Sequence, residues 1–118
     1  MRFLKRSCLV ISLGAFFISI PFVSSAQLMS GKKLVADMQE FEKAERQDPA
    51  ANYQQAYFFM GYVAGVFDLS DDTYLYPVKP TIRQVCSVVA KYLKDNPKEW
   101  NLPGDLIITK ALKKAFPK

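Results

Sequence analysis

The sequence predicts an all-α protein, a small bundle of approximately four helices that follows a cleaved N-terminal signal peptide. Apolar residues recur at helical spacing in four segments of the 118-residue chain. Residues that favour helix ends stand beside each of these segments. No segment shows the strict alternation of apolar and polar residues that is typical of a β-strand. These three observations place the chain in the all-α class.

Residues 1–26 have the three parts of a secretory signal peptide. Basic residues stand at the start, an apolar run reaches Phe22, and small side chains occupy Ser24 and Ala26 before the expected cleavage point. An uncleaved membrane anchor is the alternative, but the apolar run is short and ends in a proline and a small-residue site. We therefore expect cleavage after Ala26, export to the periplasm, and one mature domain of residues 27–118.

Composition limits what the mature domain can do. Of the 16 basic residues three lie in the leader, which holds none of the 11 acidic ones, so a net charge of +2 remains and nucleic acid is not indicated as a partner. The chain has no His, the commonest base near neutral pH. Cys8 lies in the leader, so Cys86 is the one mature thiol. We expect a protein that binds rather than catalyses, with no catalytic residue, metal site or cofactor.

The role of Cys86 has two interpretations. It falls in the middle of a predicted helix beside an apolar residue, with no His to activate it. Free Cys of this kind is usually a small, inert core residue. An intermolecular disulfide or a reactive thiol is the alternative.

The first helix is predicted in residues 28–44, with Ser30 as its N-cap. Its apolar stripe is the set Leu34, Val35, Met38 and Phe41. Asp37 is assigned to the opposite, charged side. An amphipathic helix of this kind is expected to cover a core with one face.

The second helix is predicted to begin at Pro49, capped by Asp48, and to run to about Leu69. No charge occurs from Pro49 to Phe67, which is long enough to consider a membrane span. Polar residues in the first turns and apolar side chains on every face favour instead a buried, central helix of a soluble domain. We expect no stable membrane insertion after the leader is removed.

Two glycines interrupt this second helix. Gly61 and Gly65 share one face with Tyr57, Ala64 and Asp68. Each glycine costs the helix about 1 kcal/mol relative to alanine. We therefore predict that Gly61 and Gly65 allow another helix to approach closely.

Residues 69–80, LSDDTYLYPVKP, form the longest irregular segment. Two prolines stiffen it, and its Tyr and Asp side chains supply aromatic rings and negative charge. A calcium loop is disfavoured because the regular spacing of Asp or Asn ligands is missing. A solvated loop tip that can contact another molecule is the favoured interpretation.

Two more helices follow this loop. Thr81 and Gln84 form a capping box at the start of the third, and Asn96-Pro97 ends it. The fourth helix is predicted in residues 102–116, with acidic and basic residues placed to favour the helix dipole. Between them, Trp100 is either a hinge packed on the core or an exposed anchor, and the sequence leaves both open.

Four segments in this order resemble the Rap/Tai type VI secretion immunity proteins: GKKLV, YFFMGYVAGVFD, TIRQVCSVVAKYLKDNP and ALKKAFP. Together with the loop they cover nearly all of residues 27–118. The most specific pattern lies in Gly61, Tyr62, Val63, Ala64, Gly65 and Asp68. Family members commonly have cysteines where this chain has Met38, Phe59, Tyr76 or Val78, and Lys118. The resemblance therefore indicates a divergent member without that disulfide bracing.

The resemblance implies a small helical periplasmic protein that binds a peptidoglycan-cleaving amidase toxin delivered by type VI secretion. Members of that family are typically dimeric and block the active-site cleft of the toxin with surface loops, so that the producer and its kin are spared. From the chemistry of the loop we predict the partner-binding residues Ser70, Asp71, Asp72, Tyr74 and Tyr76.

Two other functions fit parts of the pattern. A small periplasmic helical chaperone of the acid-stress type has a similar size, although such proteins usually need a disulfide that this chain cannot form. A membrane-associated structural protein would use the uncharged run before Phe67.

Overall fold

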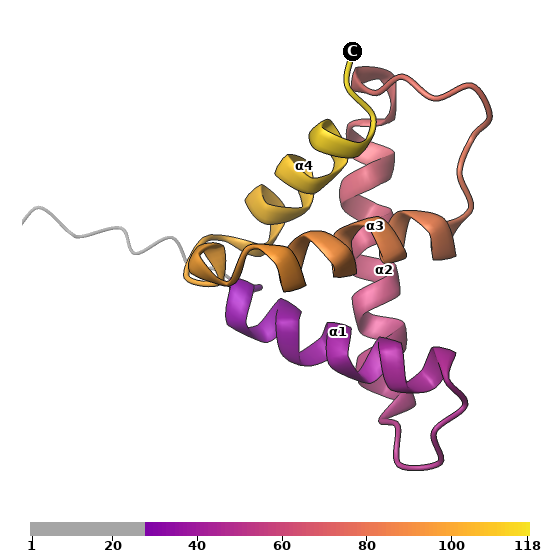
Figure 1. Ribbon diagram of the computed structural model, residues 1–118, viewed down its shortest axis with the longest axis vertical. Coiled ribbons are helices and arrows are strands. Elements are labelled where there is room, and N and C mark those ends of the chain that lie inside the picture. Colours follow the sequence, from indigo (N-terminus) through magenta and orange to yellow (C-terminus); the bar gives the residue numbers. More distant parts are fainter. Residues whose placement is uncertain (1–27) are drawn as a thin grey trace, which may run out of the picture.

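The computed structural model describes residues 28–118 as a small bundle of four α-helices (Figure 1). The elements in chain order are α1 (Gly31–Glu45), α2 (Tyr53–Leu69), the 3-10 helix η1 (Asp71–Thr73), α3 (Ile82–Asp95), the 3-10 helix η2 (Pro97–Glu99) and α4 (Gly104–Ala115). Residues 28–118 contain no β-strand, only an isolated bridge between Ser30 and Pro103. The predicted all-α class is confirmed. The predicted signal peptide and its cleavage point lie outside the described residues.

The other three helices pack on one side of α2. In Figure 1, α1 and α3 cross α2, and α4 lies beside its C-terminal half. The core lies between the four helices, and its largest completely buried apolar side chains are Leu34, Met38, Phe59, Val63, Val89, Leu93, Ile107, Ile108 and Leu112. Burial of these side chains is the main favourable contribution to folding.

Helix α1 begins as its sequence predicts, but one polar residue is buried. The Ser30 hydroxyl accepts a hydrogen bond from the backbone N–H of Lys33 at 3.2 Å. Asp37, which was expected on the charged side, is 0% exposed and pairs with Lys33 one turn earlier. It lies three residues after Leu34, on the buried arc of the helix. The flexible stem of Lys33 brings its charge to this carboxylate from the surface.

Helix α2 begins later than predicted, because Asn52 rather than Asp48 is its N-cap. The Asn52 side chain accepts from the N–H of Gln55 at 3.2 Å, while Asp48 accepts from Ala50 inside the preceding turn. Gln47 in that turn has a positive φ of 58°. This left-handed backbone conformation cannot continue the right-handed helix α1. The resulting helix has 17 residues. Within residues 28–118, none of the helices is both long and apolar enough to cross a bilayer.

The structure also corrects the expectation that α2 is buried on every face. Its buried residues, Ala56, Phe59, Val63 and Phe67, form a single stripe toward the other helices. On the opposite side, Tyr57 is 66% exposed and Phe58 is 57% exposed. The three neighbouring helices all lie on the side of α2 that carries this stripe. The outer face of α2, which carries no charge before Asp68, therefore lies at the surface.

Helix α3 begins with the predicted capping box. The Thr81 hydroxyl accepts from the N–H of Gln84 at 3.2 Å, and the Gln84 side chain accepts from the N–H of Thr81 at 2.8 Å. Cys86 is 0% exposed in the core. Burial, with a smaller contribution from the negative charge of Glu45, raises the pKa of this thiol to about 12. The core interpretation of Cys86 is thus confirmed.

The first described residues are held against the connection between η2 and α4. The N–H of Gly31 donates to the carbonyl of Leu102, and the N–H of Gly104 donates to the carbonyl of Met29, both at 2.9 Å. A Cβ on Gly31 would lie 2.4 Å from the carbonyl oxygen of Trp100. A Cβ on Gly104 would lie 2.7 Å from a side-chain carbon of Met29. Close packing of this junction therefore requires these two glycines, which the sequence did not single out.

Trp100 belongs to the same junction. Its indole Nε1–H donates to the carbonyl of Leu93 at 2.7 Å, and its ring packs against the core. A buried indole normally needs such a partner for its N–H. Of the two interpretations left open by the sequence, the packed hinge is the one that the structure shows.

Candidate partner-binding surface

The longest connection in the bundle joins α2 to α3, and it stands out from the helices in Figure 1. We call residues 70–81 the α2–α3 loop. Its first turn is fixed by Ser70, whose hydroxyl donates to the carbonyl of Val66 and shares a hydrogen bond with the Tyr74 hydroxyl, each at 2.8 Å. The Thr73 hydroxyl donates to the carbonyl of Ser70 at 2.6 Å. These bonds continue the end of α2 into the one-turn helix η1.

Aromatic packing holds the middle of the α2–α3 loop against the bundle. The ring of Tyr74 stacks on Phe67 of α2, with centroids 5.8 Å apart and planes 10° apart. The rings of Tyr76 and Phe116 form an edge-to-face pair, with centroids 6.1 Å apart and planes at 81°. Aromatic pairs of this geometry contribute about 0.5–1.5 kcal/mol each beyond burial of area. The loop is thus anchored to α2 and to the residue that ends α4.

A polar contact closes the α2–α3 loop on itself. The Tyr76 phenol donates to the carboxylate of Asp71, and the Lys79 ammonium lies 3.4 Å from the other oxygen of that carboxylate. The hydrogen bond from Tyr76, and then the interaction with Lys79, lower the pKa of Asp71. The same contact raises the pKa of Tyr76. At neutral pH the carboxylate is ionised and the phenol is protonated, which is the pair of states that the hydrogen bond needs.

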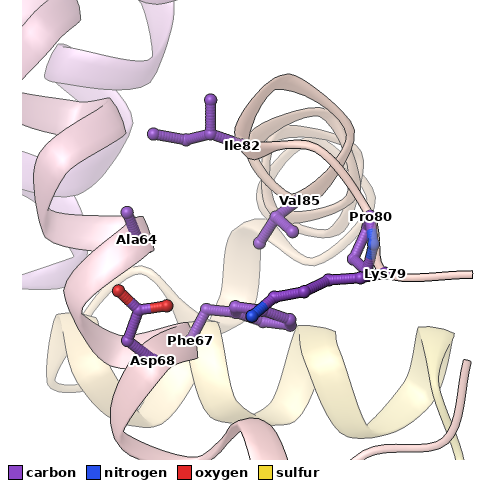
Figure 2. A pocket seen from close by; sticks show the side chains of 7 residues that line it. All are labelled: Ala64, Phe67, Asp68, Lys79, Pro80, Ile82 and Val85. Atoms are coloured by element: carbon purple, nitrogen blue, oxygen red, sulfur yellow. The ribbon is translucent and has the colours of Figure 1, made fainter.

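A small cleft lies between α2, the end of the α2–α3 loop and the start of α3 (Figure 2). It is lined by Ala64, Phe67, Asp68, Lys79, Pro80, Ile82 and Val85. In Figure 2, the side chain of Lys79 extends across the ring of Phe67 toward Asp68, and Val85 projects from α3 above them. The cleft holds about 270 Å³, which is less than most sites for small-molecule ligands. Its size suits a side chain of another protein.

Comparison with known proteins gives the family. The family model of the Rap1a immunity proteins matches residues 30–117. The chain belongs to this family. No curated protein and no solved structure matches the chain. The matched range begins at the N-cap of α1 and ends beyond α4, so it includes all four helices and the α2–α3 loop.

The five predicted contact residues do not share one role in this Rap1a family member. Asp72 is exposed, and Asp71 is partly covered by its partners Tyr76 and Lys79. Tyr74 is 5% exposed, and Ser70 and Tyr76 are half-buried. Four of the five therefore build the loop, while Asp72 alone presents its whole side chain to solvent.

Several of the side chains that this Rap1a family member exposes around the loop are apolar. Leu69 is 90% exposed, Leu75 is 59% exposed and Val78 is 80% exposed. Tyr74 and Tyr76 point inward on either side of Leu75, as alternate residues of an extended segment do. The alternation Tyr-Leu-Tyr was the signal in the sequence that could have assigned Leu75 to the outside.

Gly61 and Gly65 do not pack against another helix of residues 28–118. Among the residues that the structure describes, a Cβ on either glycine would meet no atom within 4 Å. Both face solvent, because α1, α3 and α4 cover the opposite side of α2. No helix of residues 28–118 approaches these glycines.

Proposed function

We propose that this Rap1a family member is a periplasmic immunity protein that binds and blocks a peptidoglycan-cleaving amidase effector of a type VI secretion system. The match to the Rap1a immunity proteins supports an immunity role. The observation that carries the more specific proposal is the α2–α3 loop, which is held rigid from inside and presents apolar residues outside. The producing cell and its kin would be spared because the amidase is bound before it cuts their wall.

The loop suits inhibition by occlusion. An amidase of the Cys-His type needs an open cleft in which both catalytic groups reach the substrate. A segment inserted in that cleft excludes the substrate with no chemistry of its own. Because Ser70, Tyr74 and Tyr76 already fix the α2–α3 loop in the free protein, little conformational entropy is lost when it binds.

The exposed side chains of the α2–α3 loop indicate which residues would contact the effector. Leu75 and Val78 are the apolar anchors, since exposed apolar side chains gain most when they are removed from water. Asp72 supplies a charge at the rim that would steer and orient the partner. The cleft beside Lys79 would receive one apolar side chain of the effector, with Asp68 close to its mouth. This assignment moves the predicted contacts from the inward tyrosines to their outward neighbours.

We propose in addition that the protein has no catalytic activity of its own. The chain has no His, and the thiol of Cys86 is buried with its pKa raised to about 12. Burial and a high pKa both disfavour the thiolate that acts as a nucleophile. We also propose export by the leader of residues 1–26 and, from the resemblance, a homodimer.

The test is capture and rescue. The gene neighbourhood is expected to encode a secreted Cys-His amidase, and the full chain should co-purify with it from periplasmic extracts. Co-expression should restore growth to cells that carry this amidase in their periplasm. It should not restore growth to control cells that carry an amidase from an unrelated system. No complex and no rescue with the neighbouring amidase would remove the proposal. Protection of unrelated proteins from aggregation at low pH would favour the chaperone instead.

A further inference from the structure

A groove distinct from the cleft beside Lys79 lies between α3 and α4. It holds about 380 Å³ and is therefore the larger of the two. Its lining residues are Val88, Lys91, Tyr92 and Asp95 on α3, and Ala111, Lys114 and Ala115 on α4. Residues at these spacings of three, four and seven share one face of a helix. We call this feature the α3–α4 groove.

The least exposed side chains of the α3–α4 groove are apolar. Val88 and Tyr92 are half-buried, and Ala111 is buried. The side chains of Ala111 and Ala115 are short, which leaves the space beside Tyr92 open. The hydroxyl of Tyr92 donates to the carboxylate of Glu99. Because this hydrogen is already used, the floor of the groove offers no side-chain donor that would orient a small ligand.

Lysines dominate the rim of the groove. The Lys91 ammonium lies 2.7 Å from the carboxylate of Asp95, one helical turn later. The hydrogen bond from Lys91, and then the charges of Lys114 and Lys94, lower the pKa of Asp95, so three ammonium groups act on one carboxylate. Lys114 forms no salt bridge within residues 28–118. Its ammonium lies 6.0 Å from the centroid of the Tyr92 ring.

Charge is unevenly distributed along the chain. Residues 88–118, which include the second half of α3 and all of α4, hold seven lysines and three acidic residues. Residues 28–87 hold six basic and eight acidic residues. The positive charge of the mature domain is thus concentrated in the part of the chain that forms the α3–α4 groove. Electrostatic complementarity favours an anionic partner there.

We propose that the α3–α4 groove is a second contact surface for the effector and takes an acidic segment of it. One apolar side chain of that segment enters between Tyr92 and Ala111, and carboxylates beside it pair with Lys91 and Lys114. Lys114 can form this pair without breaking a salt bridge of the free protein. The inference rests on the proposed function, because its partner is the effector assigned there.

The groove lies next to the surface already assigned to the effector. Ala115 directly precedes Phe116, whose ring packs against Tyr74 and Tyr76 of the α2–α3 loop, with centroids 6.5 and 6.1 Å apart. In Figure 1, the end of α4 lies beside the end of α2, where this loop starts. An effector that receives the loop is therefore within reach of the groove. Two contacts on one partner would fix its orientation as well as its position.

An anionic lipid surface is the other occupant that the lysines could suit. Each lysine near such a surface adds to binding. Helices that lie on a membrane also insert large apolar side chains between the lipids. The exposed large apolar side chains of α3 and α4 are Ile82 and Leu106, and neither lines the groove. A hollow with charge at its rim favours an inserted protein side chain over a lipid surface.

Two variants of the exported protein test the proposal, with the amidase encoded beside its gene as the probe. Lys114→Glu reverses a charge at the rim and keeps the space, whereas Ala115→Leu fills the space and keeps the charge. Each should raise the dissociation constant about tenfold or more. For Lys114→Glu the loss should arise mainly from slower association at about 0.05 M salt and should shrink at about 0.5 M salt.

Matched controls come from α1. Lys32→Glu and Ala36→Leu make the same changes at exposed residues that do not line the groove, and both should bind as the wild type does. Urea unfolding should give similar stabilities for all four variants, because the replaced side chains face solvent. At saturating concentration Lys114→Glu should still inhibit the amidase completely, since the α2–α3 loop occludes its cleft.

The outcomes separate this inference from the immunity proposal. A wild type that binds the amidase, with both groove variants binding equally well, would remove the groove contact and leave the immunity proposal standing. No binding of the wild type would remove both. Loss of inhibition by saturating Lys114→Glu would overturn the second-contact role, since the groove itself would then cover the active site. Sedimentation of the wild type, but not of Lys114→Glu, with phosphatidylglycerol vesicles would assign the groove to a membrane and overturn the proposal.

Discussion

The phenol of Tyr76 donates a hydrogen bond to the carboxylate of Asp71, five residues earlier, and so closes the α2–α3 loop on itself. The ring of Tyr76 packs at the same time against Phe67 and Phe116. One side chain thereby joins the loop, the end of α4 and the end of α2. The order of the loop depends on this residue more than on the exposed residues at its tip.

Tyr76→Phe tests the polar part of this contact alone, since the aromatic packing is kept. We expect faster hydrogen exchange in residues 70–79 and a several-fold loss of affinity for the effector, because order must then be established on binding. Hydrogen exchange followed by mass spectrometry and binding by calorimetry provide the measurements. Unchanged exchange in the loop would show that aromatic packing alone holds it.

The contact also predicts how loop order depends on pH. Because the folded pKa of Asp71 is lowered, its contribution is present above the ordinary aspartate value of about 4 and is lost as the pH falls through the folded value. Loop exchange in the wild type should begin to approach that of Asp71→Asn as the pH falls below about 4, and should reach it once the pH is below the lowered folded value. A difference between the two proteins that persists at lower pH would contradict the assignment. The raised pKa of Tyr76 predicts a second loss as the pH rises above about 10.

Substitutions at the exposed apolar residues should separate binding from folding. Leu75→Asp and Val78→Asp are each expected to lower affinity for the amidase about tenfold or more. The free energy of unfolding should change by no more than about 0.5 kcal/mol, because both side chains already face water. Leu106→Asp on α4 is the control, since the side chain of Leu106 is exposed as well, by 44%, and lies on another surface. Equal losses of affinity in all three variants would argue against a contact centred on the loop.

Substitution by alanine should change the stability of the protein in opposite directions at Gly31 and at Gly61. Gly31→Ala forces a Cβ into the backbone carbonyl of Trp100, so we expect a loss of about 1–3 kcal/mol in the free energy of unfolding. Gly61→Ala fills open space, so the monomer should gain up to about 1 kcal/mol from helix propensity. Urea unfolding at protein concentrations where the chain is monomeric compares the two. A tolerated Gly31→Ala would mean that the junction at Leu102 can relax.

Cys86 should be unreactive in the native protein. Its thiol is completely buried, and burial raises its pKa to about 12. A thiol reagent at pH 8 is therefore expected to label the chain only after unfolding, at a rate set by the opening of the core. Rapid and complete labelling of the folded protein would contradict the core position.

Much of the fold could be read from local patterns. The apolar stripe of α1, its Ser30 cap and the capping box at Thr81 depend on residues three or four positions apart, and all three appear as predicted. The start of α2 was placed too early because Asp48 and Asn52 are both good caps. Glu40 favours Asn52 as the N-cap, because its carboxylate accepts a hydrogen bond from the N–H of Asn52 at 2.7 Å across the turn. A contact between residues twelve apart is not visible in local sequence.

The surface was harder to predict than the core. The sequence by itself determined the all-α class and the family, because periodicity and motif order are properties of the chain alone. Only the tertiary structure decided which side of α2 stays in water, which tyrosines of the loop turn inward, and which glycines touch another backbone. Each of these depends on where α1, α3 and α4 come to rest, and the exposure of a side chain is fixed by its neighbours in space rather than by its neighbours in sequence.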